Sequence, residues 1–485
     1  MLPPSPLEWL DPGHLAYFVL DVVTTSLDLE EIERPIQAKD WRGERPYSPR
    51  MMVALLIYGY CVGVFSSRRM ARATYEDVAF RVLAGGEHPH FTTINQFRLE
   101  HREALAALFI QVLRLCRKAG LVKLGHVSFD GSKVAANASK HKAMSYRRMQ
   151  EEERRLAAEV EALLKRADEA DRAEDERFGV GKAAEDLPAE LRRREDRLSR
   201  IREAKAALER EAAQARAEAL LDLAEGMRRK AADETVAPGK RAEAATRAGR
   251  SEQEARELWR KSDDDDDRPG GTTGDEDLPQ HRVRVESDGT PKPKAQRNFT
   301  DPDSRIMLKD GAVVQAYNVQ IAVDAEAQVI LAAAVTNQAP DAEHLVPMLD
   351  RVVENCGTAP DVATADNGYL SKDGIDACAE RGVRAYISVG ADPGKTMRKG
   401  RFTPATQARE AMAAKLCTDP GKAIYARRKA IAEAPFGQIK QARGFRRFSF
   451  RGLRNVRREW SFVALTHNLL KLFRYGRTIV PQAVG

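Results

Sequence analysis

The chain has 485 residues, too many for one compact core, so two or three domains are expected. Hydrophobic residues make up 43% of it and charged residues 31%, which provides a core and at least one strongly solvated segment. It has no apolar stretch of the roughly 20 residues that span a bilayer, no leader-like start and no CxxC pair among its five scattered cysteines. These features argue against a membrane protein, a disulfide framework and a zinc knuckle, and we expect a cytoplasmic protein.

The positive charge is concentrated near the end of the chain. Residues 421–480 contain fifteen Lys or Arg and only two acids, so this segment carries +13 while the whole chain carries +7. Such a local field attracts a polyanion. A solvated basic tail is the alternative, but it does not account for the interleaved aromatic residues, Phe436, Phe445, Phe448, Phe450 and Trp460.

Residues 1–122 are predicted to form an all-helical N-terminal DNA-binding domain. Ser48-Pro49 starts one helix, Thr92-Thr93 starts another, and residues 105–119 continue as an amphipathic helix that stops at Gly120. Short helices with exposed arginines suit a helix-turn-helix reader of DNA, and from the pattern alone an ordinary helical bundle is equally probable. The arginines in question are Arg68, Arg69, Arg72 and Arg98.

A strand and a long insertion follow. Residues 126–135 alternate in the manner of a strand that carries Asp130 on one face. Residues 142–298 are rich in Ala, Glu and Arg and predict a charged antiparallel helical hairpin. By composition, we expect this insertion to end in a disordered acidic linker containing Asp263–Asp267, which would offer no fixed geometry for a metal.

Strand patterns resume in residues 299–475. Residues 313–323 and 328–336 predict a hairpin, and further strands are expected at 361–366 and 384–389, with helices at 344–356 and 372–381. This succession indicates a mixed central sheet covered by helices, formed by residues 123–141 and 299–475.

Two aspartates at strand ends and one glutamate on a late helix form a candidate metal site. Asp130 lies in Phe-Asp-Gly-Ser-Lys, Asp366 in Ala-Asp-Asn-Gly-Tyr, and Glu433 inside the basic segment. Carboxylate oxygens are the ligands that Mg²⁺ requires, and two such ions can support an in-line displacement at phosphorus. Each acid alone has an ordinary explanation, a turn residue or a partner of Lys429, but their joint occurrence favours a site.

The helix with Glu433 also carries Lys440, two turns further on and on the same face. Pro435 is expected to kink this helix. Lys440 and the neighbouring arginines, Arg443, Arg446 and Arg447, are candidates for contacts to DNA phosphates.

Together these motifs resemble the catalytic signature of bacterial insertion-sequence DDE transposases. The late motif reads Tyr-x2-Arg-x4-Glu-x6-Lys, from Tyr425 to Lys440, and the Gly-Phe-Arg-Arg-Phe run at 444–448 also has a counterpart in that family. The resemblance implies a ribonuclease-H-like catalytic domain with Asp130 beside Asp366. It also implies that Asp130, Asp366 and Glu433 bind two Mg²⁺ ions, with Mn²⁺ as a substitute.

The same resemblance implies that Tyr425, Arg428 and Lys440 contact the transposon end. The sequence departs from the commonest form of the motif, because four residues instead of three separate Arg428 from Glu433. Lys429 would suit the usual spacing by charge.

The expected function is cleavage of DNA at the ends of the element and strand transfer into target DNA. The partners would be terminal inverted repeats, target DNA and a second subunit, in a nucleoid-associated protein. An inactive or domesticated DNA-binding relative would lack an acidic ligand, and none is missing here. A metal-dependent nuclease without strand transfer would use the same three acids.

Overall fold

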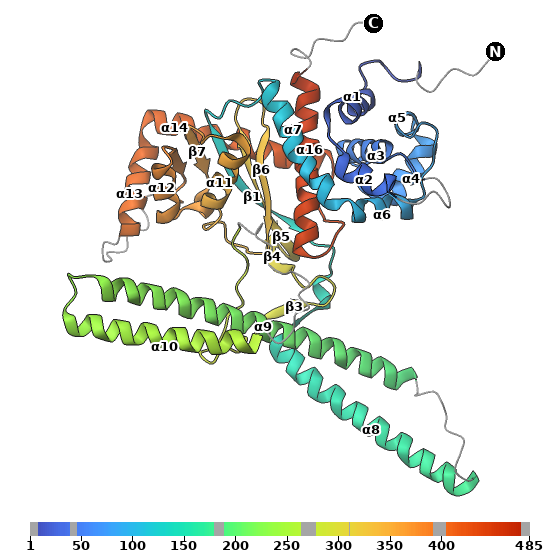
Figure 1. Cartoon of the computed structure of the whole chain (residues 1–485), viewed down its shortest axis with the longest axis vertical. Helices are drawn as coiled ribbons and strands as arrows, with labels where there is room; N and C mark the ends of the chain where they lie inside the picture. Colours follow the sequence, from blue (N-terminus) through green and yellow to red (C-terminus); the bar gives the residue numbers. More distant parts are fainter. Residues whose placement is uncertain are drawn as a thin grey trace. The chain divides into compact units, whose positions relative to one another are not determined.

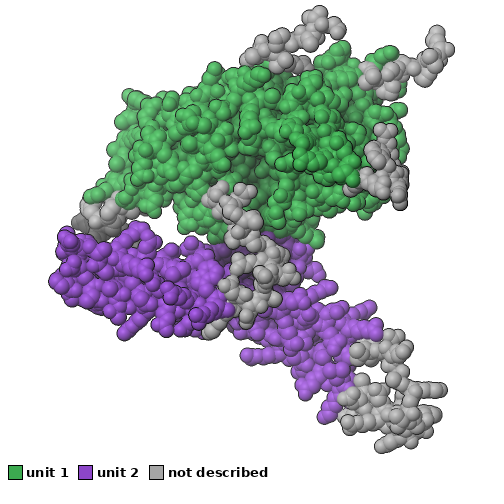
Figure 2. Space-filling model, viewed as in Figure 1, with its two compact units in different colours: residues 1–137, 274–280, 306–485 green, residues 138–273, 281–305 purple. Residues whose placement is uncertain are grey.

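The computed structural model describes residues 8–38, 46–178, 189–262, 278–309, 311–390 and 404–476. Its contacts divide the chain into two compact units, which Figure 2 colours separately. The first contains residues 1–137, 274–280 and 306–485, and the second contains residues 138–273 and 281–305. Most of the predicted insertion at 142–298 falls in the second unit, and its Asp263–Asp267 segment lies outside the described residues.

Short helices make up the N-terminal part of the first unit. They are α1 Leu15–Asp21, the π-helix η2 Val22–Ser26, α2 Glu30–Gln37, α3 Pro49–Cys61, α4 Ser67–Glu76, α5 Val78–Leu83, α6 Phe91–Glu100 and α7 Arg102–Lys118. The helix α3 begins at Pro49 as predicted, and every residue from Met51 to Cys61 is buried. Neither this apolar helix nor any other described helix is long and apolar enough to cross a membrane.

A six-stranded mixed sheet forms the centre of the first unit. Its strands are β1 Val127–Ala135, β4 Arg305–Lys309, β5 Ala312–Asp324, β6 Ile330–Thr336, β7 Val362–Ala365 and β8 Arg384–Ile387. β4 and β6 pair with β5, and β1, β7 and β8 follow in that order. β1 is antiparallel to β5 and parallel to β7, and β7 is parallel to β8. The predicted hairpin is confirmed as β5 and β6, and the predicted mixed sheet with helices is present.

Helices cover both sides of this sheet, and Figure 1 shows α11 and α12 on one side and α7 and α16 on the other. The remaining helices are α11 Leu345–Cys356, η4 Asn367–Tyr369, α12 Lys372–Glu380, α13 Pro404–Cys417, α14 Asp419–Ala426, η5 Lys429–Glu433, α15 Ala434–Gly437, η6 Gln438–Ala442 and α16 Leu453–Tyr475. α16 also packs on α3 and α7, so the N-terminal helices and the sheet share one compact unit.

A side chain of α16 also pairs with the backbone at the start of the edge strand β6. Asn468 accepts a hydrogen bond from the N–H of Ile330 at 2.8 Å and donates one to its carbonyl at 2.8 Å. This pair replaces the neighbouring strand that β6 lacks, because a buried backbone group without a partner is costly.

The second unit contains three long helices, where the sequence predicted a hairpin of two. They are α8 Tyr146–Phe178, α9 Ala189–Ala232 and α10 Pro238–Ser262; the short helix η3 Lys140–Lys142 and a two-stranded sheet, β2 Ala143–Ser145 and β3 Gln296–Asn298, complete the unit. The apolar stripes of α8 and α9 pack together as predicted. The third helix was missed because the buried hydrophobic residues of α10 are alanines, Ala244, Ala248 and Ala255, which give a weak apolar signal.

Candidate functional site

The sheet places Asp130 and Asp366 on neighbouring strands at the same level. In the parallel pair of β1 and β7, Ser128 lies opposite Thr364. Two residues further along each strand direction lie Asp130 and Asp366, and Asp366 comes immediately after the end of β7. Neighbouring strands lie about 4.8 Å apart and level residues share a face, so the two carboxylates project on the same side of the sheet.

Local hydrogen bonds orient both aspartates. Asp130 is 9% exposed, and its Oδ1 accepts a hydrogen bond from the N–H of Gly131 at 3.0 Å. Asp366 caps η4, and its Oδ1 accepts from the N–H of Gly368 at 2.8 Å. The turn after β7 therefore fixes one carboxylate oxygen of Asp366.

A π-helical turn brings Glu433 towards Asp130. Residues Lys429–Glu433 form the π-helix η5, in which residues five apart lie one above the other. Arg428 and Glu433 are five residues apart, and Nη2 of Arg428 lies 3.4 Å from Oε1 of Glu433. The same guanidinium reaches Asp130, with Nη1 at 4.0 Å from Oδ1. The extra residue in the late motif is thus absorbed by the π turn.

This geometry distinguishes Arg428 from Lys429. The side chain of Arg428 is only 11% exposed and lies between two acids, whereas Lys429 is exposed. Pro435, which was predicted to kink the helix, lies in the first turn of α15, where a proline loses no helical hydrogen bond.

Lys440 contacts the same strand as Asp130. Its ammonium donates to Oγ of Ser132 and lies 3.4 Å from the carbonyl of Lys133. Ser132 is two residues from Asp130 and therefore lies on the same face of β1. The late motif thus contacts β1 at two points, through Arg428 and through Lys440.

The electrostatics of the site are dominated by the burial of Asp130. Burial raises the pKa of its carboxyl to about 7, Arg428 opposes this shift, and the negative charges of Asp366 and Glu433 add to it. The acids of the site therefore carry more negative charge than the Arg428 guanidinium, which lies among them, can balance.

These residues have the chemistry of a divalent-cation site. Their donors are hard carboxylate oxygens, and the positively charged Arg428 guanidinium lies between Asp130 and Glu433. As the side chains stand, no three His, Cys, Asp or Glu residues in the described part of the chain are placed closely enough to hold a metal ion. The acids would hold a metal only after Arg428 moves or the carboxylates draw together.

The arginines predicted to grip DNA differ in their exposure. Arg446 and Arg447 are exposed. Arg443 is buried, and its Nη1 donates to Oγ1 of Thr466 at 2.8 Å and faces the carbonyl of Tyr60 at 3.4 Å. Arg443 thus links α3 to α16. Its burial contradicts the prediction that it contacts DNA phosphates at the surface. Tyr425 is partly exposed, with the Arg428 guanidinium 5.9 Å from its ring centre.

The expectation that Arg98 is exposed is wrong. It is 5% exposed, donates to the carbonyl of Phe65 at 2.8 Å and forms an ion pair with Glu459 at 3.9 Å. Glu459 also accepts from the hydroxyl of Tyr60 at 3.2 Å and from the N–H of Phe450 at 3.1 Å. The pattern of the sequence could not show this, because the two partners are far apart along the chain.

Two family models match the chain. Residues 5–100 match the model described as "Transposase domain (DUF772)", and residues 284–469 match the model described as "Transposase DDE domain". Together the matches cover more than half of the chain. The chain belongs to the DDE transposases of insertion sequences. Comparisons with curated proteins and with solved structures give no match.

The matched regions of this DNA transposase include two of the three candidate ligands. Asp366 and Glu433 lie within the DDE match, whereas Asp130 lies between the two matches. Within this gap, α8, α9 and α10 separate β1 from the rest of the sheet along the chain. The pairing of β1 with β7 brings Asp130 back beside Asp366.

Proposed function

We propose that Asp130, Asp366 and Glu433 bind divalent metal ions, Mg²⁺ with Mn²⁺ as a substitute, and that the transposase uses them to cut and join DNA. The observation that carries this proposal is the level placement of Asp130 and Asp366 on β1 and β7, with Glu433 linked to Asp130 through Arg428. The sheet order, β6, β5, β1, β7 and β8, supports a ribonuclease-H-like catalytic domain.

The reaction requires no covalent intermediate with the protein. Water attacks phosphorus at the end of the element, and the bond to the 3′ oxygen breaks. The freed 3′ hydroxyl then attacks phosphorus in the target and displaces its 3′ oxygen. When bound between these residues, Mg²⁺ would polarise the phosphoryl group and lower the pKa of the attacking water. The three carboxylates would hold the metal ions, and Lys440, which donates a hydrogen bond to Ser132, provides a positive charge beside the site.

The other assignments follow the same proposal. Residues 1–122 would bind DNA, 123–141 with 299–475 would carry the chemistry, and the insertion at 142–298 would provide spacing or further contacts. The substrates would be terminal inverted repeats and target DNA, and the active form a homodimer.

Metal binding tests the ligand set in the absence of DNA. Asp130→Asn, Asp366→Asn and Glu433→Gln should each weaken Mn²⁺ binding at least about tenfold in calorimetry, because each removes a charged ligand. Glu326→Gln, in the turn between β5 and β6, is the control and should bind Mn²⁺ as the native protein does. If the three variants bind like the control, these acids are not the ligands.

The difference in burial between the arginines makes a second prediction. Replacing both Arg446 and Arg447 by Ala should lower the slope of log affinity against log salt for a DNA end by about 1 to 2, because each exposed arginine neutralises one phosphate. Arg443→Gln should leave this slope unchanged and lower the melting temperature instead, because its guanidinium is buried. Equal slopes for the native protein and the double variant would show that Arg446 and Arg447 do not contact DNA phosphates.

A further inference from the structure

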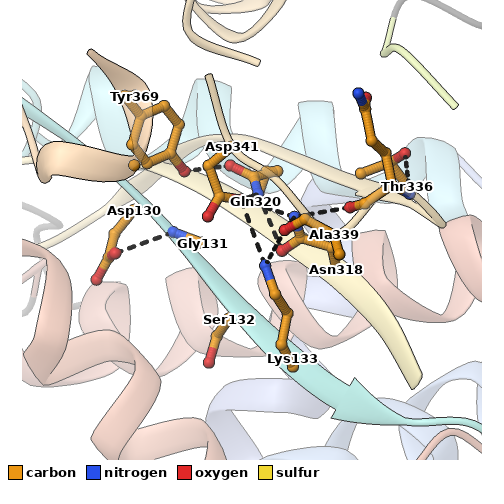
Figure 3. Close-up of polar contacts among 12 residues, drawn as sticks. Asp130, Gly131, Ser132, Lys133, Asn318, Gln320, Thr336, Ala339, Asp341 and Tyr369 are labelled. Atoms are coloured by element: carbon orange, nitrogen blue, oxygen red, sulfur yellow. Dashed lines mark hydrogen bonds and ion pairs between the residues drawn. The ribbon is translucent and has the colours of Figure 1, made fainter. Parts of the chain in front are cut away.

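A polar cluster lies on the side of β1 opposite to Arg428 and Lys440. It consists of Lys133, Asn318, Gln320, Asp341 and Tyr369, and Figure 3 shows these side chains around Asp341. Lys133 and Ser132 are consecutive on β1, so their side chains point to opposite faces. Ser132 contacts the late motif through Lys440, and Lys133 contacts the cluster.

One oxygen of Asp341 holds the cluster together. Its Oδ1 accepts from Nδ2 of Asn318 at 2.6 Å and from Nε2 of Gln320 at 2.8 Å, and it lies 3.5 Å from the Lys133 ammonium. Asn318 and Gln320 come from β5, Lys133 from β1, and Asp341 from the loop before α11. A single carboxylate thus ties two strands to one loop, and its loss would remove one acceptor from each of these three donors.

Further hydrogen bonds fix this loop and the turn after β7. Lys133 donates to the carbonyl of Ala339 at 2.8 Å, and Asn318 donates to that of Gln338 at 3.0 Å. Tyr369, which is 1% exposed, donates its hydroxyl to Oε1 of Gln320. Tyr369 belongs to η4, the turn that Asp366 caps, so the cluster reaches the second aspartate as well as the strand of the first.

The cluster packs directly on two glycines that adjoin the aspartates. A Cβ atom on Gly131 would lie 2.5 Å from Nε2 of Gln320 and 3.0 Å from Oδ1 of Asp341. A Cβ atom on Gly368 would lie 3.0 Å from Oδ1 of Asp366 and 3.4 Å from Oδ2 of Asp341. Gly131 therefore has no room for a side chain while the cluster is intact. The Asp341 carboxylate therefore lies against the backbone next to Asp130 and close to that of Asp366.

Charge connects the cluster to the aspartates in the same way. Burial lowers the pKa of the Lys133 ammonium, and Asp341 opposes this shift most, followed by Asp366 and Asp130. Lys133 is thus a partly buried cation that contacts Asp341 directly and lies in the field of Asp366 and Asp130.

We propose that Asp341 is a positioning residue of the metal centre, which sets the relative placement of Asp130 and Asp366 through the polar cluster without binding the metal itself. This inference rests on the proposed function. It gives Gly131 and Gly368 a shared role as the backbone surface against which the cluster packs.

The test is Mn²⁺ binding to the full chain by calorimetry, together with the melting temperature. Asp341→Asn should weaken Mn²⁺ binding about 10- to 100-fold, the range found for residues that orient metal ligands. Glu343→Gln is the matched control, because Glu343 lies in the same loop and pairs only with Gln338 among the contacts described for it. It should bind Mn²⁺ as the native protein does.

A second variant keeps the inference testable if Asp341→Asn does not fold. Tyr369→Phe removes one hydroxyl that fixes Gln320, and it should weaken Mn²⁺ binding about three- to tenfold. A purely structural role would lower the melting temperature of these variants while the folded protein bound Mn²⁺ with native affinity, and that result would overturn the inference.

The same measurement separates this inference from the proposed function. If Asp130→Asn and Asp366→Asn lose Mn²⁺ binding while Asp341→Asn and Tyr369→Phe keep it, only the role of Asp341 is wrong. If Asp130→Asn and Asp366→Asn bind Mn²⁺ as well as the native protein, the metal centre itself is misassigned and the inference fails with it.

Discussion

Asp130→Asn is expected to lower DNA cleavage at least about a thousandfold, equivalent to about 4 kcal/mol of transition-state stabilisation, without destabilising the metal-free protein. Most replacements of a buried group lower stability. This one removes a carboxylate whose pKa burial raises to about 7 from an ordinary value of 3.8. Asn has nearly the same shape and carries no charge to bury.

The pH dependence of stability provides the measurement. Because the folded-state pKa of Asp130 lies above the unfolded value, this group stabilises the metal-free fold at low pH, and that contribution is lost as the pH rises from about 4 to about 7. Asp130→Asn has no carboxyl at this position, so its stability does not fall for this reason as the pH rises. In the presence of a chelator, its melting temperature at pH 8 should therefore equal or exceed that of the native protein.

Adding Mg²⁺ should reverse the order of the two melting temperatures. A metal that binds only the folded native protein raises its stability, and the variant with a missing ligand gains little. A variant that melts well below the native protein at pH 8 without metal would show that the Asp130 carboxylate is needed for folding, and loss of cleavage could then not be assigned to the metal.

Glu459→Ala should lower the free energy of unfolding by about 3 to 5 kcal/mol. Glu459 is 2% exposed and is shared by an ion pair with Arg98, the hydroxyl of Tyr60 and the N–H groups of Ser449 and Phe450. Its removal leaves the buried Arg98 guanidinium without its counter-ion and three donors without this acceptor. Urea denaturation measures the loss.

Two further variants make this prediction specific. Glu459→Gln should fall between the native protein and the Ala variant, because an amide still accepts one of these hydrogen bonds. Glu103→Ala is the exposed control, since Glu103 pairs with Arg454 at 2.9 Å and Arg458 at 2.8 Å, and it should cost less than about 1 kcal/mol. Equal losses at Glu459 and Glu103 would mean that the buried network contributes nothing special to the fold.

The strands could be predicted from the sequence, but not how they meet. Alternation and turn residues were sufficient for β1 and for the hairpin of β5 and β6. The pairing of β1 with β7 joins segments separated by the whole insertion, and no local pattern carries that information. The level placement of Asp130 and Asp366 therefore had to come from the structure, although the resemblance to a family implied that they are neighbours.

The remaining differences have a common cause, which is that partners distant in sequence decide the role of a polar residue. Arg98 and Arg443 resemble the exposed arginines around them, and only their contacts with Glu459 and Thr466 show that they are buried. The four-residue spacing after Arg428 was an anomaly in the sequence and is explained by the π turn of η5. Asp341 lies in a polar loop where an acid carries no signal of its own.

The most direct test of the metal centre is cleavage and joining of a labelled terminal inverted repeat with Mg²⁺, comparing the native protein with Asp366→Asn and Asp373→Asn. Asp373 is an exposed acid in the first turn of α12, so its replacement makes the same charge change seven residues from Asp366. We predict that the native protein and Asp373→Asn cut and join the DNA, whereas Asp366→Asn binds it and does neither. Cleavage and joining by Asp366→Asn at the native rate would contradict the assignment of Asp366 as a metal ligand.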